Sequence, residues 1–140
     1  MIKPKLILCA DYAMLDSQTN GVSVINILED ITPEGFPLFL PRLTILSILE
    51  KDPEDPDTVA TRLVVRLNEQ QIFTAETPIE FQGKKRNRHI TVLGGVPIPN
   101  PGPLTAVVLI DGNEIHSYTV EINPSRAQPQ IREEKASYGG

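Results

Sequence analysis

The sequence predicts an all-β fold, a two-layer antiparallel sandwich of about eight strands. Short stretches rich in Val, Ile and Leu recur along the chain, and nearly every gap between them contains Gly, Pro, Asn or Asp. The chain holds 13 proline residues, which disfavour long helices. No stretch shows the apolar periodicity of an amphipathic helix, so α/β enzyme folds are also disfavoured.

Turn signals and alternation place the strands of the first half. Asn20-Gly21 is a turn pair between two apolar stretches, and residues 32–37 are expected to form a loop. The stretch that carries Arg62 and Arg66 alternates, with both arginines on the face opposite its apolar residues. We therefore expect strands at residues 5–13, 22–28, 43–49 and 59–67.

The second half continues the same pattern. In a strand at residues 72–81, Pro78 predicts a sheet edge or a bulge, because proline cannot donate a backbone hydrogen bond. Asp111-Gly112 predicts a hairpin between strands at 104–110 and 115–122. The proline-rich residues 93–101 are expected to be an extended connection that covers the core.

Composition limits the classes of protein. One domain fits 140 residues, with 40% hydrophobic and 22% charged side chains. No apolar run approaches the length of a membrane span, and Asp11 interrupts the short N-terminal apolar stretch, so we expect no membrane association and no signal peptide. Cys9 is the single cysteine, expected to be a buried thiol, which fits a reducing cytoplasm. The net charge of −5 disfavours nucleic acid as a partner.

The strand pattern ends at Ile122. We expect a β-sandwich domain at residues 1–122 and a polar tail at residues 123–140, flexible in isolation, that ends in Gly139-Gly140.

Two groups of segments form a recognisable pattern. The first is Leu8-Cys9-Ala10-Asp11, residues 21–30, Phe36-Pro37 and residues 40–43, and the second is Pro97-Ile98-Pro99-Asn100-Pro101-Gly102 leading into residues 107–112. Together they resemble a bacterial family of small uncharacterised proteins with an immunoglobulin-like sandwich. The resemblance covers roughly residues 5–122 and implies an immunoglobulin-like antiparallel β-sandwich. Its motifs are structural, and the family has no established activity to transfer.

No residue pattern predicts catalysis. His89 and His116 lie far apart in the sequence, and no serine-hydrolase, zinc-protease or paired-cysteine motif is present. The acidic residues 50–57 contain two prolines, which favours a solvated loop over a calcium loop. We expect no catalytic residues, no metal and no cofactor, and an enzyme is the least favoured hypothesis.

A basic run contains Lys84, Lys85, Arg86 and Arg88. A solvated hairpin tip is the simpler interpretation. The functional interpretation is a rim that meets an acidic protein partner and speeds the encounter.

The leading hypothesis is a non-enzymatic protein-interaction module of the bacterial cytoplasm. It would present a sheet edge or this basic rim to a protein partner.

The alternative hypothesis is a protein modifier, because a compact domain with a slender Gly139-Gly140 tail resembles ubiquitin-like modifiers. Its partners would be an activating enzyme and a carrier enzyme. Those modifiers have a central helix, and the sequence predicts none here. The oligomeric state stays open.

Overall fold

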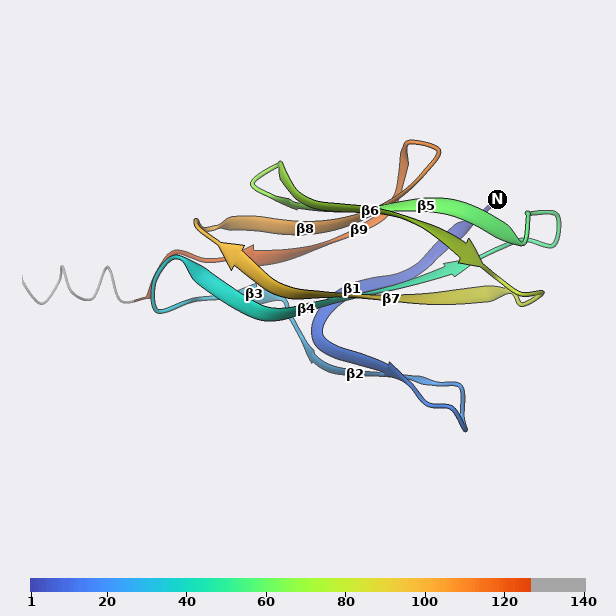
Figure 1. The fold of residues 1–140 in the computed structure, drawn as a ribbon, viewed down its shortest axis with the longest axis horizontal. Helices are drawn as coiled ribbons and strands as arrows, with labels where there is room; N and C mark the ends of the chain where they lie inside the picture. The colour runs from blue at the N-terminus through green and yellow to red at the C-terminus, as the bar shows by residue number, and fades with distance from the viewer. Residues whose placement is uncertain (127–140) are drawn as a thin grey trace, which may run out of the picture.

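Nine strands form two sheets that lie face to face in residues 1–126, the part of the chain that the computed structural model describes (Figure 1). The all-β prediction is confirmed, and the nine strands are the seven placed from the sequence plus a two-residue strand at Asp30–Ile31 and a long one at Arg86–Ile98. The strands are β1 (Lys3–Leu15), β2 (Val22–Ile27), β3 (Asp30–Ile31), β4 (Leu38–Glu50), β5 (Thr58–Leu67), β6 (Gln70–Glu80), β7 (Arg86–Ile98), β8 (Gly102–Ile110) and β9 (Asn113–Ile122).

The first sheet has the order β2-β1-β4-β7 and the second has the order β3-β9-β8-β5-β6. All neighbours are antiparallel except β3 and β9. The successive strands β6 and β7 are each the last strand of their sheet. A short turn joins them, so the two edges lie on the same side of the sandwich (Figure 1).

The main core fills the space between the sheets. Alternating positions of each strand point inward, as β5 illustrates with Leu63 and Val65 buried and Arg62 exposed. Cys9 is buried here as predicted, and burial raises the pKa of its thiol to about 12. The cysteine is therefore protonated at neutral pH and serves as a small core side chain.

Pro78 lies in β6, where its missing N–H faces no neighbour among residues 1–126. The prediction of an edge position is therefore confirmed. On the outer surface of the second sheet, Arg62 pairs with Glu76 of the neighbouring strand β6, and Arg66 pairs with Glu114 of β9, one strand further away across β8. The first pair follows from the predicted alternation, because Arg62 and Glu76 are directly opposed and share a face.

The predicted connection at residues 93–101 is wrong for most of its length. Residues 93–98 belong to β7, which pairs with β4 as far as Ile98. An edge strand tolerates Pro97 because only one of its sides needs hydrogen bonds. Gly95 has a positive φ of 69°, and the inward face changes there from Leu93 to Val96. Because Leu93 and Val96 both face the core although they are three residues apart, the sequence of β7 lacks the strict alternation that predicts a strand.

The hairpin of β1 and β2, residues 10–27, forms an arm that leaves the first sheet and lies against its outer face (Figure 1). Val22 and Val24 of the arm contact the cluster that holds Leu46 and Ile90. At the tip, an Arg88 guanidinium nitrogen donates to the side-chain oxygen of Asn20 at 2.6 Å. The arm thus shields apolar side chains that a two-layer sandwich would leave exposed.

The last described residues stay attached to the sandwich. The Asn123 N–H donates to the Ile31 carbonyl at 2.8 Å, and the Arg126 N–H donates to the Pro33 carbonyl at 2.9 Å. Within residues 1–126, no helix is long and apolar enough to span a membrane.

Candidate binding site between beta6 and beta7

The two edge strands β6 and β7 enclose a seam on one side of the sandwich. At the end nearest the turn, the Asn87 side chain donates to the Glu80 carbonyl at 2.9 Å and holds the strands together. Away from the turn the strands diverge (Figure 1). Within residues 1–126, neither strand has a further strand on its outer side. The seam is therefore closed at one end and open at the other.

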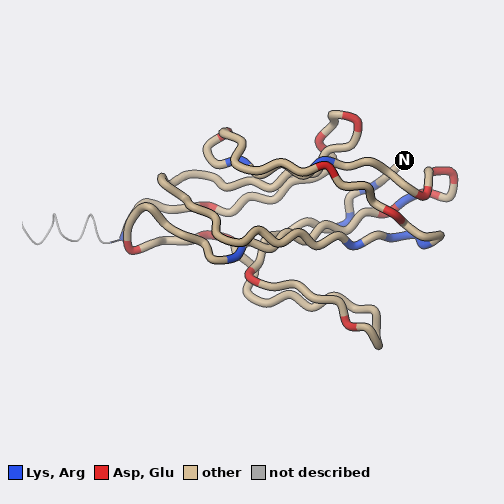
Figure 2. The backbone as a smooth tube through the Cα atoms, in the orientation of Figure 1, with Lys and Arg blue, Asp and Glu red and all other residues tan. Residues whose placement is uncertain are grey.

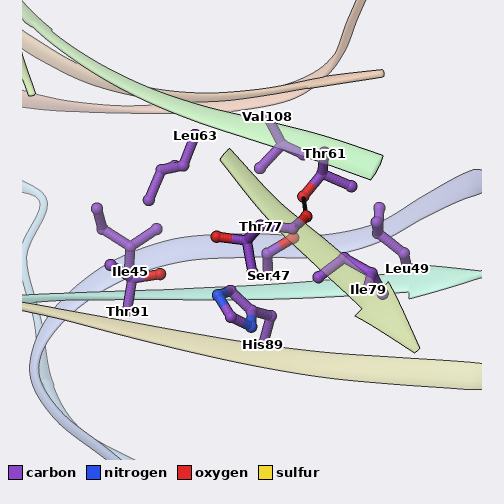
Figure 3. A pocket seen from close by; sticks show the side chains of 10 residues that line it. All are labelled: Ile45, Ser47, Leu49, Thr61, Leu63, Thr77, Ile79, His89, Thr91 and Val108. Carbon is purple, nitrogen blue, oxygen red and sulfur yellow. Dashed lines mark hydrogen bonds between the residues drawn. The ribbon is translucent and has the colours of Figure 1, made fainter. Parts of the chain in front are cut away.

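Near its closed end, the seam leads to a small cavity between the sheets that is lined by both apolar and polar side chains (Figure 3). The cavity has a volume of about 20 Å³, room for about one water molecule. Thr61 donates to the Thr77 carbonyl at 2.8 Å beside it, and the His89 ring points into it from β7 (Figure 3). A substrate does not fit in this space.

One pair beside the cavity has the geometry of a nucleophile and a base. Ser47 Oγ and His116 Nε2 are 2.9 Å apart and hydrogen-bonded across the two sheets. Burial lowers the pKa of His116 and of His89, so both rings are neutral at pH 7. Ser47 is only 7% exposed, and the cavity of about 20 Å³ that it lines holds about one water molecule, so a substrate has no access to the serine hydroxyl there. The pair acts as a polar link between the sheets.

Sequence reasoning did not find this pair. Ser47 and His116 are 69 residues apart, and neither belongs to a motif. Only the packing of the two sheets against each other brings them together, and such packing leaves no local signal in a sequence.

At the open end lies a shallow apolar groove, the edge groove. Its volume is about 390 Å³. Val92 is 55% exposed and Ile72 is 41% exposed, so two large apolar side chains that line the same groove are open to solvent. The groove is lined by Ile72 and Phe73 from β6 and by residues 92–97 of β7.

Phe39 adds a third exposed apolar side chain next to the edge groove. It is 61% exposed, and its ring lies against Gly95, where an added Cβ would meet the ring at 3.0 Å. The exposed apolar surface therefore continues around the β7 edge onto the outer face of the first sheet.

The backbone of β7 offers unpaired groups along the same edge. Lys51 donates its N–H to the carbonyl of Lys85, the residue directly opposite, at 2.9 Å. In an antiparallel pair such hydrogen-bonded positions alternate with positions whose groups point away from the partner strand. The register of β4 and β7 is regular, so the alternation that starts at Lys85 continues along β7. Ile90 and Val92 therefore direct their N–H and C=O groups away from β4, to the outer side of the edge.

The predicted basic rim is partly occupied by contacts within the chain. Arg86 donates to Glu50 at 2.9 Å, and Lys85 lies 3.9 Å from the same carboxylate. The hydrogen bond from Arg86 and the charge of its neighbours lower the pKa of Glu50. Arg88 binds the arm at Asn20, and Lys84 is exposed in the turn.

The basic run also begins β7 rather than forming only a hairpin tip. Arg86 and Arg88 lie in the strand, and Lys84 and Lys85 precede it. These four residues thus lie together at the closed end of the seam, but two of them, Lys85 and Arg86, already form ion pairs with Glu50 of the same chain. Their role in binding a partner stays a prediction.

The acidic loop after β4 forms local ion pairs. The Met1 amino group donates to Asp52 at 2.9 Å, and the Lys3 ammonium group lies 3.2 Å from the same carboxylate. These contacts, that of Met1 first, lower the pKa of Asp52. Within residues 1–126, no group of three or more His, Cys, Asp or Glu side chains is placed to hold a metal ion. Gly139 and Gly140 lie outside the described residues.

Comparison with known proteins identifies the chain by family alone. Residues 5–123 match DUF6941, a family of unknown function, and the chain belongs to this family. No curated protein matches the sequence.

Proposed function

We propose that this member of the DUF6941 family is a non-enzymatic protein-interaction module that binds a partner protein along the open edge of β7. The single observation that carries the proposal is an edge strand of 13 residues beside an exposed apolar groove. An extended segment that pairs with such an edge gains main-chain hydrogen bonds, and grooves beside the edge accept its side chains.

The middle of β7, residues 89–96, has features that proteins usually avoid at a sheet edge, whereas Arg86, Arg88 and Pro97 near its two ends are common there. Natural edges are short, charged or covered, because an open edge pairs with other chains. Here the Val92 side chain is exposed, and the backbone N–H and C=O of Val92 point to the outer side of the edge. Gly94 and Gly95 follow it and have no side chains that would block an approaching strand. A long open edge of this kind is explained by a partner that covers it.

The type of sandwich, the cellular location and the class of partner belong to the same proposal. We infer that the sandwich is a variant of the immunoglobulin-like type and that the protein works in the bacterial cytoplasm. Its partner is another protein, with no nucleic acid, membrane or cofactor involved.

The test compares two substitutions at one position. Val92→Pro removes the outward N–H, whereas Val92→Ala trims the same side chain and keeps the N–H. Each variant and the wild type are immobilised, and proteins captured from a native cell extract are quantified by mass spectrometry. We expect one specific partner to be captured by the wild type and by Val92→Ala, and to be lost from Val92→Pro.

Circular dichroism and thermal unfolding of Val92→Pro verify that the sandwich is retained, which is expected because the removed N–H has no partner in the described chain. Equal capture by Val92→Pro and the wild type contradicts binding along the β7 edge.

The alternative function, conjugation through the C-terminal glycines, is a separate proposal that Gly139-Gly140 supports. N-terminally tagged protein is expressed with its native gene neighbours, beside a version without Gly139 and Gly140, and both are blotted under denaturing conditions. A modifier produces bands of higher mass that disappear on truncation. A single band in both lanes contradicts this proposal and leaves the edge-binding proposal unaffected.

A further inference from the structure

Both histidines of the chain face the layer between the two sheets. His89 lies on β7 directly opposite Ser47 of β4, and its ring points into the small cavity (Figure 3). His116 lies on β9 directly opposite Val108, which also lines the cavity, and its Nε2 is 2.9 Å from Ser47 Oγ. Because directly opposed side chains are neighbours on one face, Ser47 has an imidazole ring on either side.

The surroundings of the two rings carry no charge that would balance a proton. In the described part of the chain, none of the residues that line the cavity is Asp, Glu, Lys or Arg, and charged residues gather mostly in turns and toward strand ends (Figure 2). Two charged residues lie close to the histidines along the strands, but both have other partners. Arg88 binds Asn20 of the arm, and Glu114 binds Arg66 on the outer surface of the second sheet.

The other strands around this layer also contribute neutral groups. β5, β6 and β8 line the cavity with Thr, Leu, Ile and Val side chains, which do not titrate. Cys9 of β1 and Tyr118 of β9 face the core beside it. Burial raises the pKa of Cys9 to about 12 and also raises the pKa of Tyr118, so both keep their protons where histidine titrates.

A protonated ring in this layer loses hydration without gaining an anion. Burial therefore lowers the pKa of His89 and of His116 below the ordinary value of histidine, which is about 6.5. As the pH falls through that value, the unfolded chain binds protons more readily than the folded chain does. The stability that the neutral rings provide is complete above about pH 6.5, and it is lost as the pH falls toward the pKa values of the folded protein.

We infer that His89 and His116 make the contact between the two sheets sensitive to pH, so that mild acid weakens a sandwich that is stable at neutral pH. The Ser47–His116 hydrogen bond joins β4 of the first sheet to β9 of the second. His89 lies beside it, on the strand that borders the seam with β6. Charge on either ring therefore acts where the sheets meet. This inference does not depend on the proposed function, because it concerns the folded chain without a partner.

The first test follows the histidine ring protons of the full chain by NMR between about pH 8 and about pH 5. The single variants His89→Gln and His116→Gln assign the two sets of resonances. We expect both rings to titrate at lower pH than the histidines of the same chain unfolded in urea. Titration of either ring at the same pH as in urea, or at higher pH, overturns the inference, because the layer then accepts the charge without cost.

The second test measures urea unfolding at about pH 7.5 and about pH 5.5, where the carboxylates stay ionised. From the higher to the lower pH, the unfolding equilibrium constant of the wild type is expected to rise several-fold more than that of the double variant His89→Gln/His116→Gln. Lys84→Gln removes a charge from an exposed turn residue, and this matched control is expected to respond to pH as the wild type does.

The single variants keep one histidine each, and their response to pH is expected to lie between those of the wild type and the double variant. They supply the comparison if the double variant does not fold. The same rise in the wild type and in the variants without one or both histidines overturns the inference, because the loss of stability in acid then has another source.

Discussion

Replacing Gly102 with alanine is expected to lower the free energy of unfolding by about 3 kcal/mol or more. Gly102 begins β8 with a φ of 140°, a backbone conformation that side chains disfavour. An added Cβ would lie 1.7 Å from Asn68 Oδ1, and Asn68 cannot yield without losing the bond it donates to the Pro101 carbonyl at 2.9 Å. Backbone strain and steric overlap therefore add together.

Gly112→Ala is the matched control for this substitution. Gly112 also has a positive φ, 78°, but a Cβ there would have no atom within 4 Å. Only the backbone term applies, and we expect a loss of about 1–2 kcal/mol. Chemical denaturation of the three proteins measures both effects, and equal losses at the two glycines would contradict the close approach of Asn68.

Replacing Phe81 with alanine is expected to cost about 3–5 kcal/mol. Phe81 is 2% exposed and forms a cluster with Leu49 and Ile79 where the seam between β6 and β7 closes. Its backbone N–H donates to the Asp57 carbonyl at 2.8 Å, which fixes the start of the turn. The substitution leaves a cavity at the point that holds the two edge strands together.

Phe39→Ala removes the same side chain from an exposed site and is expected to cost less than about 1 kcal/mol. Thermal or chemical unfolding of both variants gives the comparison. A loss at Phe81 no larger than that at Phe39 would show that the closed end of the seam is not packed as described.

Local signals were sufficient for most of the fold. The alternation around Arg62 and Arg66, the Asp111-Gly112 turn and the edge position of Pro78 each follow from the stereochemistry of a few adjacent residues. The sandwich class follows from their repetition along the chain.

Long-range contacts account for what the sequence could not predict. β7 is a strand because β4 pairs with it, although Pro97 and the Gly94-Gly95 pair are typical of a connection. The arm depends on the contact of Val22 and Val24 with the cluster around Leu46 on another strand. Neither contact has a signal within one segment of the sequence.

The candidate site was predicted only in part. The basic run was recognised from its composition, but its engagement with Glu50 and Asn20 depends on the register of β4 and on the position of the arm. The open edge of β7 follows from strand order, and strand order is a property of the whole fold.

Amide hydrogen exchange along β7, followed residue by residue by NMR, tests the central claim most directly. We expect the N–H groups of Ile90 and Val92 to exchange rapidly in the protein alone, and those of Thr91 and Leu93 to be protected by β4. Adding the partner protein captured by the wild type is expected to slow exchange at Ile90 and Val92. Protection of Val92 in the protein alone, or unchanged rapid exchange with saturating bound partner, would contradict an open edge that binds by strand addition.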